Sequence, residues 1–202
     1  METLPFMISI IFFLISGSNL FFGSYIVLFY SREKSNRLFF VFCIFLSVWA
    51  FGFAMSVSAP DAESCMFWRR VAALGWGTCP GIFLHYTLVL TGKKDLLKKW
   101  WLYLLMYTPV AIMSYVFSLS QDLVILQYTF LRTPYGWINL AEDNLWDILF
   151  YCYYYGFMLI SMGVLWRWTI KTEDELNRKQ GKTILAGFMV SLILVISTKI
   201  YS

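Results

Sequence analysis

The stretch "GWGTCPGIFLHYTLVLTGKK", residues 75–94, decides how this sequence is read. It is apolar enough to lie in a membrane, yet it contains Pro80, several glycines and His85, the only histidine of the chain. Proline and glycine weaken the interior of an isolated helix. Their presence in an apolar segment must therefore be explained by contacts with neighbouring segments.

The composition indicates an integral membrane protein. The chain has 202 residues, of which 59% are hydrophobic and 14% charged, and its mean hydropathy is +0.65. Soluble domains are about half apolar and a quarter charged. Aromatic residues make up 20% of the chain, and Trp and Tyr collect where a membrane meets water. The net charge is only +4, and the distribution of the charges argues for membrane topology rather than nucleic-acid binding.

Long apolar stretches predict the fold class. A membrane-spanning helix needs about 20 apolar residues, and six stretches reach that length. The sequence therefore predicts an all-α integral membrane protein, with a bundle of six transmembrane helices in a single domain, 1–202. The predicted helices cover about residues 5–30, 38–59, 71–91, 100–120, 146–168 and 184–201. The first stretch lacks a basic flank and is too long for a signal peptide, so we interpret it as a retained helix.

The distribution of Lys and Arg predicts the orientation. Of the 16 basic residues, twelve lie in or beside the first, third and fifth connections, and four lie in the other connections and the two ends. Connections rich in Lys and Arg stay in the cytoplasm. The sequence therefore predicts that the N-terminus lies outside and that, after six crossings, the C-terminus lies outside as well.

The connection before the fifth helix is unusually long for a helix bundle, and long loops often carry structure or function. Its part "LVILQYTFL", residues 123–131, is rich in β-branched and aromatic residues. The segment "TPYGW", residues 133–137, offers a turn with Pro134 at the first central position. These features predict a short β-hairpin over the outer mouth of the bundle. The alternative is an amphipathic segment resting on the lipid headgroups.

Four residues of the third helix are spaced by four and share one face: Ala73, Gly77, Gly81 and His85. Small residues at this spacing let a neighbouring helix approach closely. Pro80 removes a backbone donor and predicts a bend, and the carbonyl that it frees needs a partner inside the protein. We therefore assign Ala73, Gly77, Pro80 and Gly81 to helix packing.

His85 lies at the inner end of this face. One histidine makes neither a metal site nor a catalytic triad. A structural hydrogen bond to a neighbouring helix is the favoured interpretation, and a role in signalling or proton transfer is the alternative, because ionisable groups at such depth often have a function.

Charged and aromatic residues gather near the outer boundary. Arg69, Arg70 and Asp147 can snorkel to the headgroups, and a sharper hypothesis pairs one arginine with Asp147. Asp147 also suits the positive N-terminal end of the fifth helix. That helix is dense in aromatic residues and predicts an aromatic-lined outer cavity, with interfacial anchoring or core packing as the alternative. The candidate ligand-binding residues are Trp68, Arg69, Trp76, His85, Trp137, Asp147, Phe150, Tyr153 and Tyr154.

The four cysteines show no spacing typical of a metal site. Cys43, Cys65, Cys79 and Cys152 are therefore expected to pack as small apolar groups. A bridge between Cys79 and Cys152 stays open, because the sequence does not place their Cα atoms. Neither a metal nor a cofactor is expected.

Two segments carry a resemblance to a known family. "SNRLFFVFCIFLSVWAFGFAMS", residues 35–56, and "FWRRVAALGWGTCPGIFLHYTLVLTGK", residues 67–93, resemble the N-terminal seven-transmembrane sensor region of bacterial histidine kinases. The same region also precedes diguanylate cyclases. The features that carry the likeness are Asn36-Arg37, Trp49, the motif at residues 67–70 and the run at residues 80–92.

The resemblance implies a sensory input module in the bacterial cytoplasmic membrane, part of a two-component system. It would detect an extracellular or membrane-borne signal and relay it to a cytoplasmic kinase or cyclase output domain. The expected partners are the lipid bilayer, a small-molecule, peptide or lipid signal, the output domain and, as a further option, a second copy. The family implies a seventh helix and an output domain, for which these 202 residues contain no candidate. The chain is therefore not expected to be an enzyme.

The alternative is a small multi-pass transporter, channel or membrane enzyme. Such proteins usually carry intramembrane charges or broken helices in paired positions. This sequence offers one proline-bent helix and one deep histidine. A flux assay that compares the wild type with His85→Ala would separate the two hypotheses.

Overall fold

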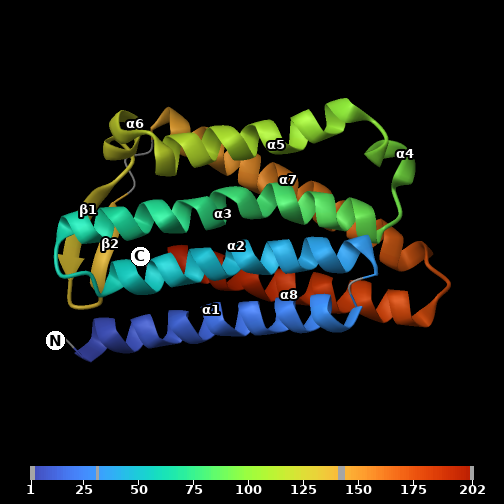
Figure 1. The fold of residues 1–202 in the computed structure, drawn as a ribbon, viewed down its shortest axis with the longest axis horizontal. Helices are drawn as coiled ribbons and strands as arrows, with labels where there is room; N and C mark the ends of the chain where they lie inside the picture. The colour runs from blue at the N-terminus through green and yellow to red at the C-terminus, as the bar shows by residue number, and fades with distance from the viewer. Residues whose placement is uncertain (1–2, 31, 141–143, 201–202) are drawn as a thin grey trace.

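The computed structural model describes residues 3–30, 32–140 and 144–200, with side chains described up to Met189. It is mostly helical, with one small sheet (Figure 1). The helices are α1 (Thr3–Tyr30), α2 (Lys34–Val57), α3 (Ala62–Leu90), α4 (Lys94–Leu97), α5 (Trp100–Ser114), the π-helix η1 (Tyr115–Leu119), α6 (Gln121–Ile125), α7 (Leu145–Lys171) and α8 (Glu175–Ile200). The strands are β1 (Thr129–Thr133) and β2 (Gly136–Leu140).

The long helices lie side by side, and α3 is central among them (Figure 1). It packs against α2 on one side and against α5 and α7 on the other, while α1 packs on α2 and α8 on α7. The β1–β2 hairpin lies at one end of the bundle, which we call the hairpin end. The turn with Lys93, Lys94, Lys98 and Lys99 lies at the opposite end, which we call the lysine end.

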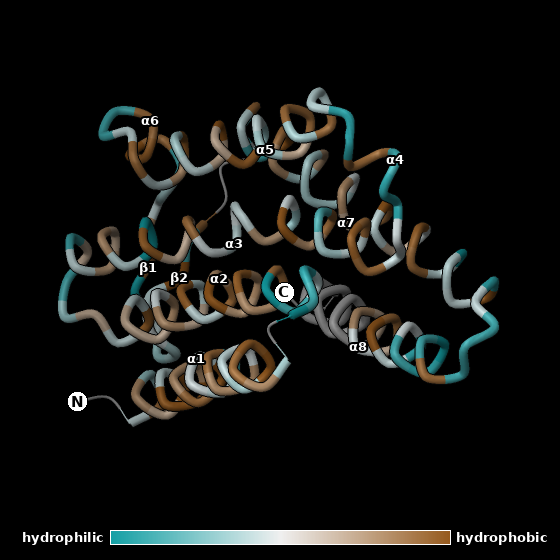
Figure 2. Tube along the Cα trace, turned by 45° about the vertical axis from the view of Figure 1, so that its right-hand side comes forward, coloured by the Kyte–Doolittle hydropathy of each residue, from teal (hydrophilic) through white to brown (hydrophobic). Residues whose placement is uncertain are grey.

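Four helical segments among the described residues are long and apolar enough to cross a membrane: α1, α2, the continuous run of α5 and η1, and α7. Their hydrophobic colouring in Figure 2 contrasts with the hydrophilic links at α4 and before α8. The sequence predicted six such helices at nearly the same places. α3 and the described part of α8 are not among the four.

Two helices begin about nine residues before their predicted starts. α3 begins at Ala62, where the side chain of Asp61 accepts a hydrogen bond from the Ser64 amide at 2.7 Å and caps the helix. Charged residues lower hydropathy without breaking a helix, so the apolar pattern missed this first part. The same holds for α8, which begins at Glu175. The predicted end of the last helix at residue 201 lies outside the described residues.

Small residues set the distance between neighbouring helices. Ser16 of α1 and Ser47 of α2 bring their hydroxyl oxygens to 2.6 Å, and each also donates to the other's carbonyl. Between α2 and α3 a Cβ atom added at Gly75 would lie 2.5 Å from the amide nitrogen of Trp49. A side chain at this glycine would therefore force the two backbones apart.

The sequence assigned close packing to a different face of α3. Ala73 is fully buried against Met113 and its neighbours, and a Cβ at Gly81 would collide with Val110, so this face does meet α5 and η1 closely. Gly77 has ordinary van der Waals space, with its nearest atom at 3.8 Å. The closer approach at Gly75, toward α2, was not predicted.

The β-hairpin is present where it was predicted. Its strands pair antiparallel from Thr129 opposite Leu140 to Thr133 opposite Gly136, with Pro134 in the two-residue turn. Gly136 has a φ of 105°, a conformation that side chains with a Cβ rarely adopt, and such a Cβ would also overlap the Val57 carbonyl. The segment before the strands forms the short helix α6 instead of extended chain.

Candidate functional site

The centre of α3 is held by a tyrosine from another helix. The Tyr153 hydroxyl of α7 donates to the Gly77 carbonyl at 3.0 Å and accepts from the Gly81 amide at 3.1 Å. In a regular α-helix the Gly77 carbonyl and the Gly81 amide would bond to each other, and Pro80 lies between them in the sequence. Tyr153 is buried and bonds the Gly77 carbonyl, whereas the carbonyl that Pro80 frees belongs to Trp76, four residues before it, so the predicted partner of that carbonyl stays a prediction. A second proline, Pro109, lies inside α5 and was not considered from the sequence.

A cavity of about 550 Å³ opens beside Tyr153 between α2, α3, α7 and α8. This volume lies within the range of about 300–1,000 Å³ typical of small-molecule sites. We call it the aromatic cavity, because nine of its thirteen described lining residues are Phe, Trp or Tyr. The lining residues are Phe42, Leu46, Trp49, Phe53, Trp76, Cys79, Phe150, Tyr151, Tyr154, Tyr155, Met158, Met162 and Phe188.

Trp76 is fixed in the wall of the aromatic cavity by edge-to-face contacts. Its ring centroid lies 4.5 Å from that of Phe150 and 5.1 Å from that of Phe117. Such pairs add stability beyond the area that they bury. The cavity wall is therefore continuous with the cluster around Tyr153, Met113 and Val116.

The structure divides the predicted ligand-binding residues among several places. Trp76, Phe150 and Tyr154 line the aromatic cavity, and Tyr153 lies directly beside it. Trp68 instead packs edge-to-face on Phe51 and Phe67. The remaining predicted residues, Arg69, His85, Trp137 and Asp147, make the contacts described below.

His85 bonds to a neighbouring helix, as the favoured interpretation expected. Its Nδ1 lies 2.7 Å from the Tyr107 hydroxyl of α5, and its ring packs edge-to-face on Tyr103. This pair lies on the side of α3 toward the lysine end, away from the aromatic cavity. Its geometry accounts for a polar side chain at this depth as an interhelical hydrogen bond.

Arg69 and Arg70 bind backbone carbonyls. Arg69 donates to the Trp137 carbonyl at 2.9 Å and lies 4.4 Å from the Phe53 ring centroid. Arg70 donates to the Ser118 and Leu119 carbonyls at 2.7 and 3.3 Å, at the end of η1. The arginines connect α3 to the hairpin and to η1.

Asp147 takes part in the start of α7. Its carboxylate accepts from the Asn144 amide at 3.2 Å, while the Asn144 side chain accepts from the Trp146 and Asp147 amides. This reciprocal arrangement is a capping box. It agrees with the expectation that Asp147 stabilises the N-terminus of this helix.

Tyr128 holds the base of the hairpin on η1. Its hydroxyl donates to the Phe117 carbonyl at 3.1 Å. Burial raises the pKa of Tyr128 well above its ordinary value, because the charged phenolate is poorly solvated there. The side chain therefore remains a neutral donor at physiological pH.

The cysteines are free thiols. Cys43, Cys65 and Cys79 are buried, and Cys152 is exposed. Burial of Cys79 in the wall of the aromatic cavity agrees with its expected packing role. The bridge between Cys79 and Cys152, which the sequence left open, is not formed.

Several lining residues of the aromatic cavity were missed from the sequence. Trp49 and Phe53 come from α2, and Met158 and Met162 come from the second half of α7. The density of aromatic residues is highest in the first half of the predicted fifth helix, so only that half was predicted to line a cavity. Trp49 and Phe53 are four residues apart, and this spacing is the signal that could have placed both on one face of α2.

The run of long apolar helices defines the class of the protein, an integral membrane protein. A family model described as the N-terminal 7TM region of histidine kinase matches residues 8–200, and the chain belongs to this family. The family is a non-catalytic input region. It is associated with the membrane and with a cytoplasmic kinase output domain. Neither a curated protein nor a solved structure matches the chain.

Proposed function

We propose that this chain senses a signal through the aromatic cavity and relays it to a cytoplasmic kinase output domain. One observation carries the proposal: the walls of the cavity come from four helices, α2, α3, α7 and α8. A ligand in such a place contacts all four at once. It can shift their arrangement if it binds one arrangement more tightly than another.

The chemistry of the lining supports an uncharged, mostly apolar signal molecule. The described walls carry no Asp, Glu, Lys or Arg, and a charged ligand would lose its hydration without gaining a counter-ion. The hydroxyls of Tyr151, Tyr154 and Tyr155 and the indoles of Trp49 and Trp76 offer the polar contacts. A flat molecule would stack on these rings.

The connection from the cavity to the backbone runs through Tyr153 and Pro80. Tyr154 and Cys79 line the cavity, and each is the chain neighbour of one of these two residues. A ligand that moves α7 against α3 would lengthen or shorten the bonds from Tyr153 to the backbone of Gly77 and Gly81. This pair of bonds is the element that we propose has two states.

The orientation forms part of the proposal. With six crossings and the N-terminus outside, the hairpin end faces the exterior and the lysine end faces the cytoplasm. The distribution of Lys and Arg supports this arrangement. A cysteine placed at Lys98 should resist a membrane-impermeant maleimide added to intact cells, whereas one placed at Tyr135 in the hairpin turn should react. Labelling at Lys98 and protection at Tyr135 would show that the chain has the opposite orientation in the membrane.

The experiment on the aromatic cavity uses two substitutions on α7. Met162→Trp fills the cavity, whereas Leu159→Trp adds the same side chain at a position that is 66% exposed and does not line it. The probe is N-phenyl-1-naphthylamine, a neutral aromatic fluorophore, added to the chain in lipid nanodiscs with empty nanodiscs as the reference. Energy transfer from the protein tryptophans to the probe reports binding.

The expected result is energy transfer in the wild type and in Leu159→Trp, and its loss in Met162→Trp. In the receptor with its output domain, Met162→Trp should also change basal kinase activity, while Leu159→Trp should not. Equal probe binding by all three proteins would refute the cavity as a ligand site. If Met162→Trp loses probe binding but keeps the kinase activity of the wild type, the proposed relay from the cavity to the output domain is refuted.

A further inference from the structure

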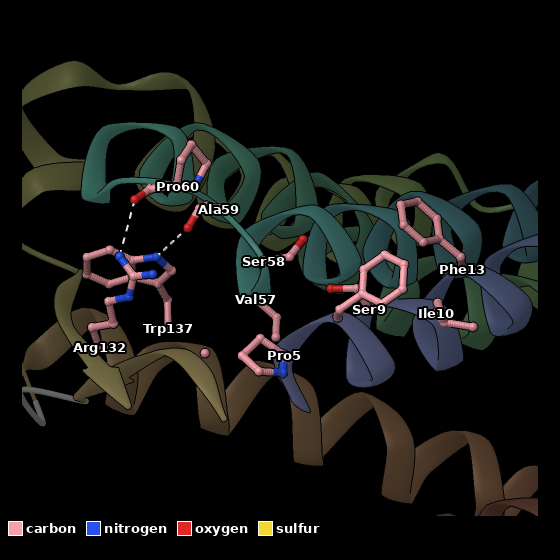
Figure 3. A pocket seen from close by; sticks show the side chains of 12 residues that line it. Pro5, Ser9, Ile10, Phe13, Val57, Ser58, Ala59, Pro60, Arg132 and Trp137 are labelled. Carbon is pink, nitrogen blue, oxygen red and sulfur yellow. Dashed lines mark hydrogen bonds between the residues drawn. The ribbon is translucent and has the colours of Figure 1, made fainter. Parts of the chain in front are cut away.

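A second cavity lies at the hairpin end, separate from the aromatic cavity. It has a volume of about 370 Å³ and lies between α1, the α2–α3 turn and the hairpin (Figure 3). Phe6, Ile10 and Phe13 form its apolar side on α1. We call it the hairpin pocket. Its test does not depend on the function proposed for the aromatic cavity.

Fixed contacts shape the wall formed by the hairpin. The Trp137 indole Nε1 donates to the Ala59 carbonyl at 2.8 Å, one of the dashed lines in Figure 3. Gly136 is buried against the Val57 backbone, and Arg69 donates a hydrogen bond to the Trp137 carbonyl at 2.9 Å. The pocket is thus formed before any ligand arrives, which lowers the ordering cost of binding.

Arg132 is the one charged side chain among the described residues that line the hairpin pocket. Its guanidinium lies 5.7 Å from the Trp137 ring centroid and makes a long hydrogen bond of 3.4 Å to the Pro60 carbonyl. The other guanidinium N–H groups have no partner within the described residues. The nearby carboxylate of Asp61 is engaged in capping α3.

The apolar side of the pocket is open to the bilayer. Phe6, Ile10 and Phe13 are 49%, 41% and 38% exposed, on a helix that is long and apolar enough to cross the membrane. A hydrocarbon chain can therefore enter from the membrane along α1, with its end at the level where Arg132 lies. The pocket joins an apolar channel to an exposed guanidinium that can bind an anion.

We propose that the hairpin pocket binds an amphiphile through its anionic head and a hydrocarbon chain. The head, a carboxylate or a phosphate, accepts hydrogen bonds from Arg132, and the chain lies on Phe6, Ile10 and Phe13. A free fatty acid and an anionic membrane lipid share this chemistry. Because the ligand would join α1 to the hairpin, its binding would tie the loop to the membrane.

The test uses palmitate with a diazirine in its chain, and its methyl ester as the uncharged control. Each probe is added to the chain in phosphatidylcholine nanodiscs and photo-activated, and the labelled peptides are identified by mass spectrometry. The acid should label the peptide that contains Phe6 to Phe13, and the ester should label this peptide at least tenfold less. The same fall is expected for the acid with Arg132→Gln, whereas Arg132→Lys should keep most of the labelling.

Two variants of α1 test the hydrocarbon channel. Ile10→Trp narrows the pocket and should remove the labelling, whereas Ile11→Trp, at a neighbouring position outside the pocket, should leave it unchanged. If phosphatidylglycerol added to the nanodiscs competes with the palmitate probe, the natural ligand is a membrane lipid. If it does not compete, the natural ligand is a free fatty acid. Equal labelling by acid and ester, or full labelling of a folded Arg132→Gln, would overturn the proposal.

Discussion

Tyr153→Phe is the sharpest perturbation of the bundle, because it removes one oxygen atom and leaves the ring in place. The lost hydroxyl makes two buried bonds, to Gly77 at 3.0 Å and to Gly81 at 3.1 Å. Side-chain hydrogen bonds within membranes contribute about 0.6 kcal/mol each on average. We therefore expect the free energy of unfolding to fall by about 1.2 kcal/mol.

The structure also sets an upper bound on the fall in the free energy of unfolding caused by Tyr153→Phe. Without the hydroxyl, the Gly77 carbonyl and Gly81 amide can bond to each other as an ordinary helical pair, so neither stays buried and unsatisfied. The loss should therefore stay below the roughly 3–5 kcal/mol typical of removing a whole buried aromatic side chain. Tyr153→Ala, which also empties the space of the ring, should reach that range.

The measurement is reversible unfolding in mixed detergent micelles, with Tyr155→Phe as the matched control. Tyr155 lies on the same helix and is 40% exposed, so its hydroxyl should change the free energy of unfolding by less than about 0.5 kcal/mol. Equal stability of Tyr153→Phe and the wild type would refute the bridging role of the hydroxyl.

Two further predictions concern α3. Gly75→Leu should separate α2 from α3 and destabilise the fold by about 1–3 kcal/mol, measured by the same unfolding assay, with Gly163→Leu, which has open space, as the control. The Ser64 amide lowers the pKa of Asp61, so its stabilisation should be full above its unfolded pKa of about 3.9 and lost as pH falls through the lower folded value. Asp61→Asn should not show this acid-dependent loss, and identical pH profiles would contradict the capping role.

The sequence could predict the features that depend on short-range patterns. Apolar length placed the helices, and the turn residues around Pro134 placed the hairpin. The stabilising role of Asp147 at the N-terminal end of α7 followed from its position at the start of an apolar run. Each of these features depends on residues within a few positions of one another.

Features that depend on which helices meet could not be predicted in the same way. The sequence assigned Tyr153 to a ligand cavity, because nothing local shows that its hydroxyl reaches the backbone of α3. The pairing of Arg69 with the Trp137 carbonyl joins positions 68 residues apart. Trp137 and Trp76 looked alike as aromatic candidates, yet they line different cavities.

The π-helix η1 has a consequence for comparing this chain with its relatives. Its wider turn, closed by the Ser120 amide on the Tyr115 carbonyl, accommodates one residue more than an α-helical turn would. Loss of one residue there would restore a regular helix and leave the preceding side chains in register. Loss of one residue within 100–114 would instead rotate the side chains on one side of it by about 100° relative to those on the other. A single-residue gap in an alignment of this segment therefore belongs at 115–119.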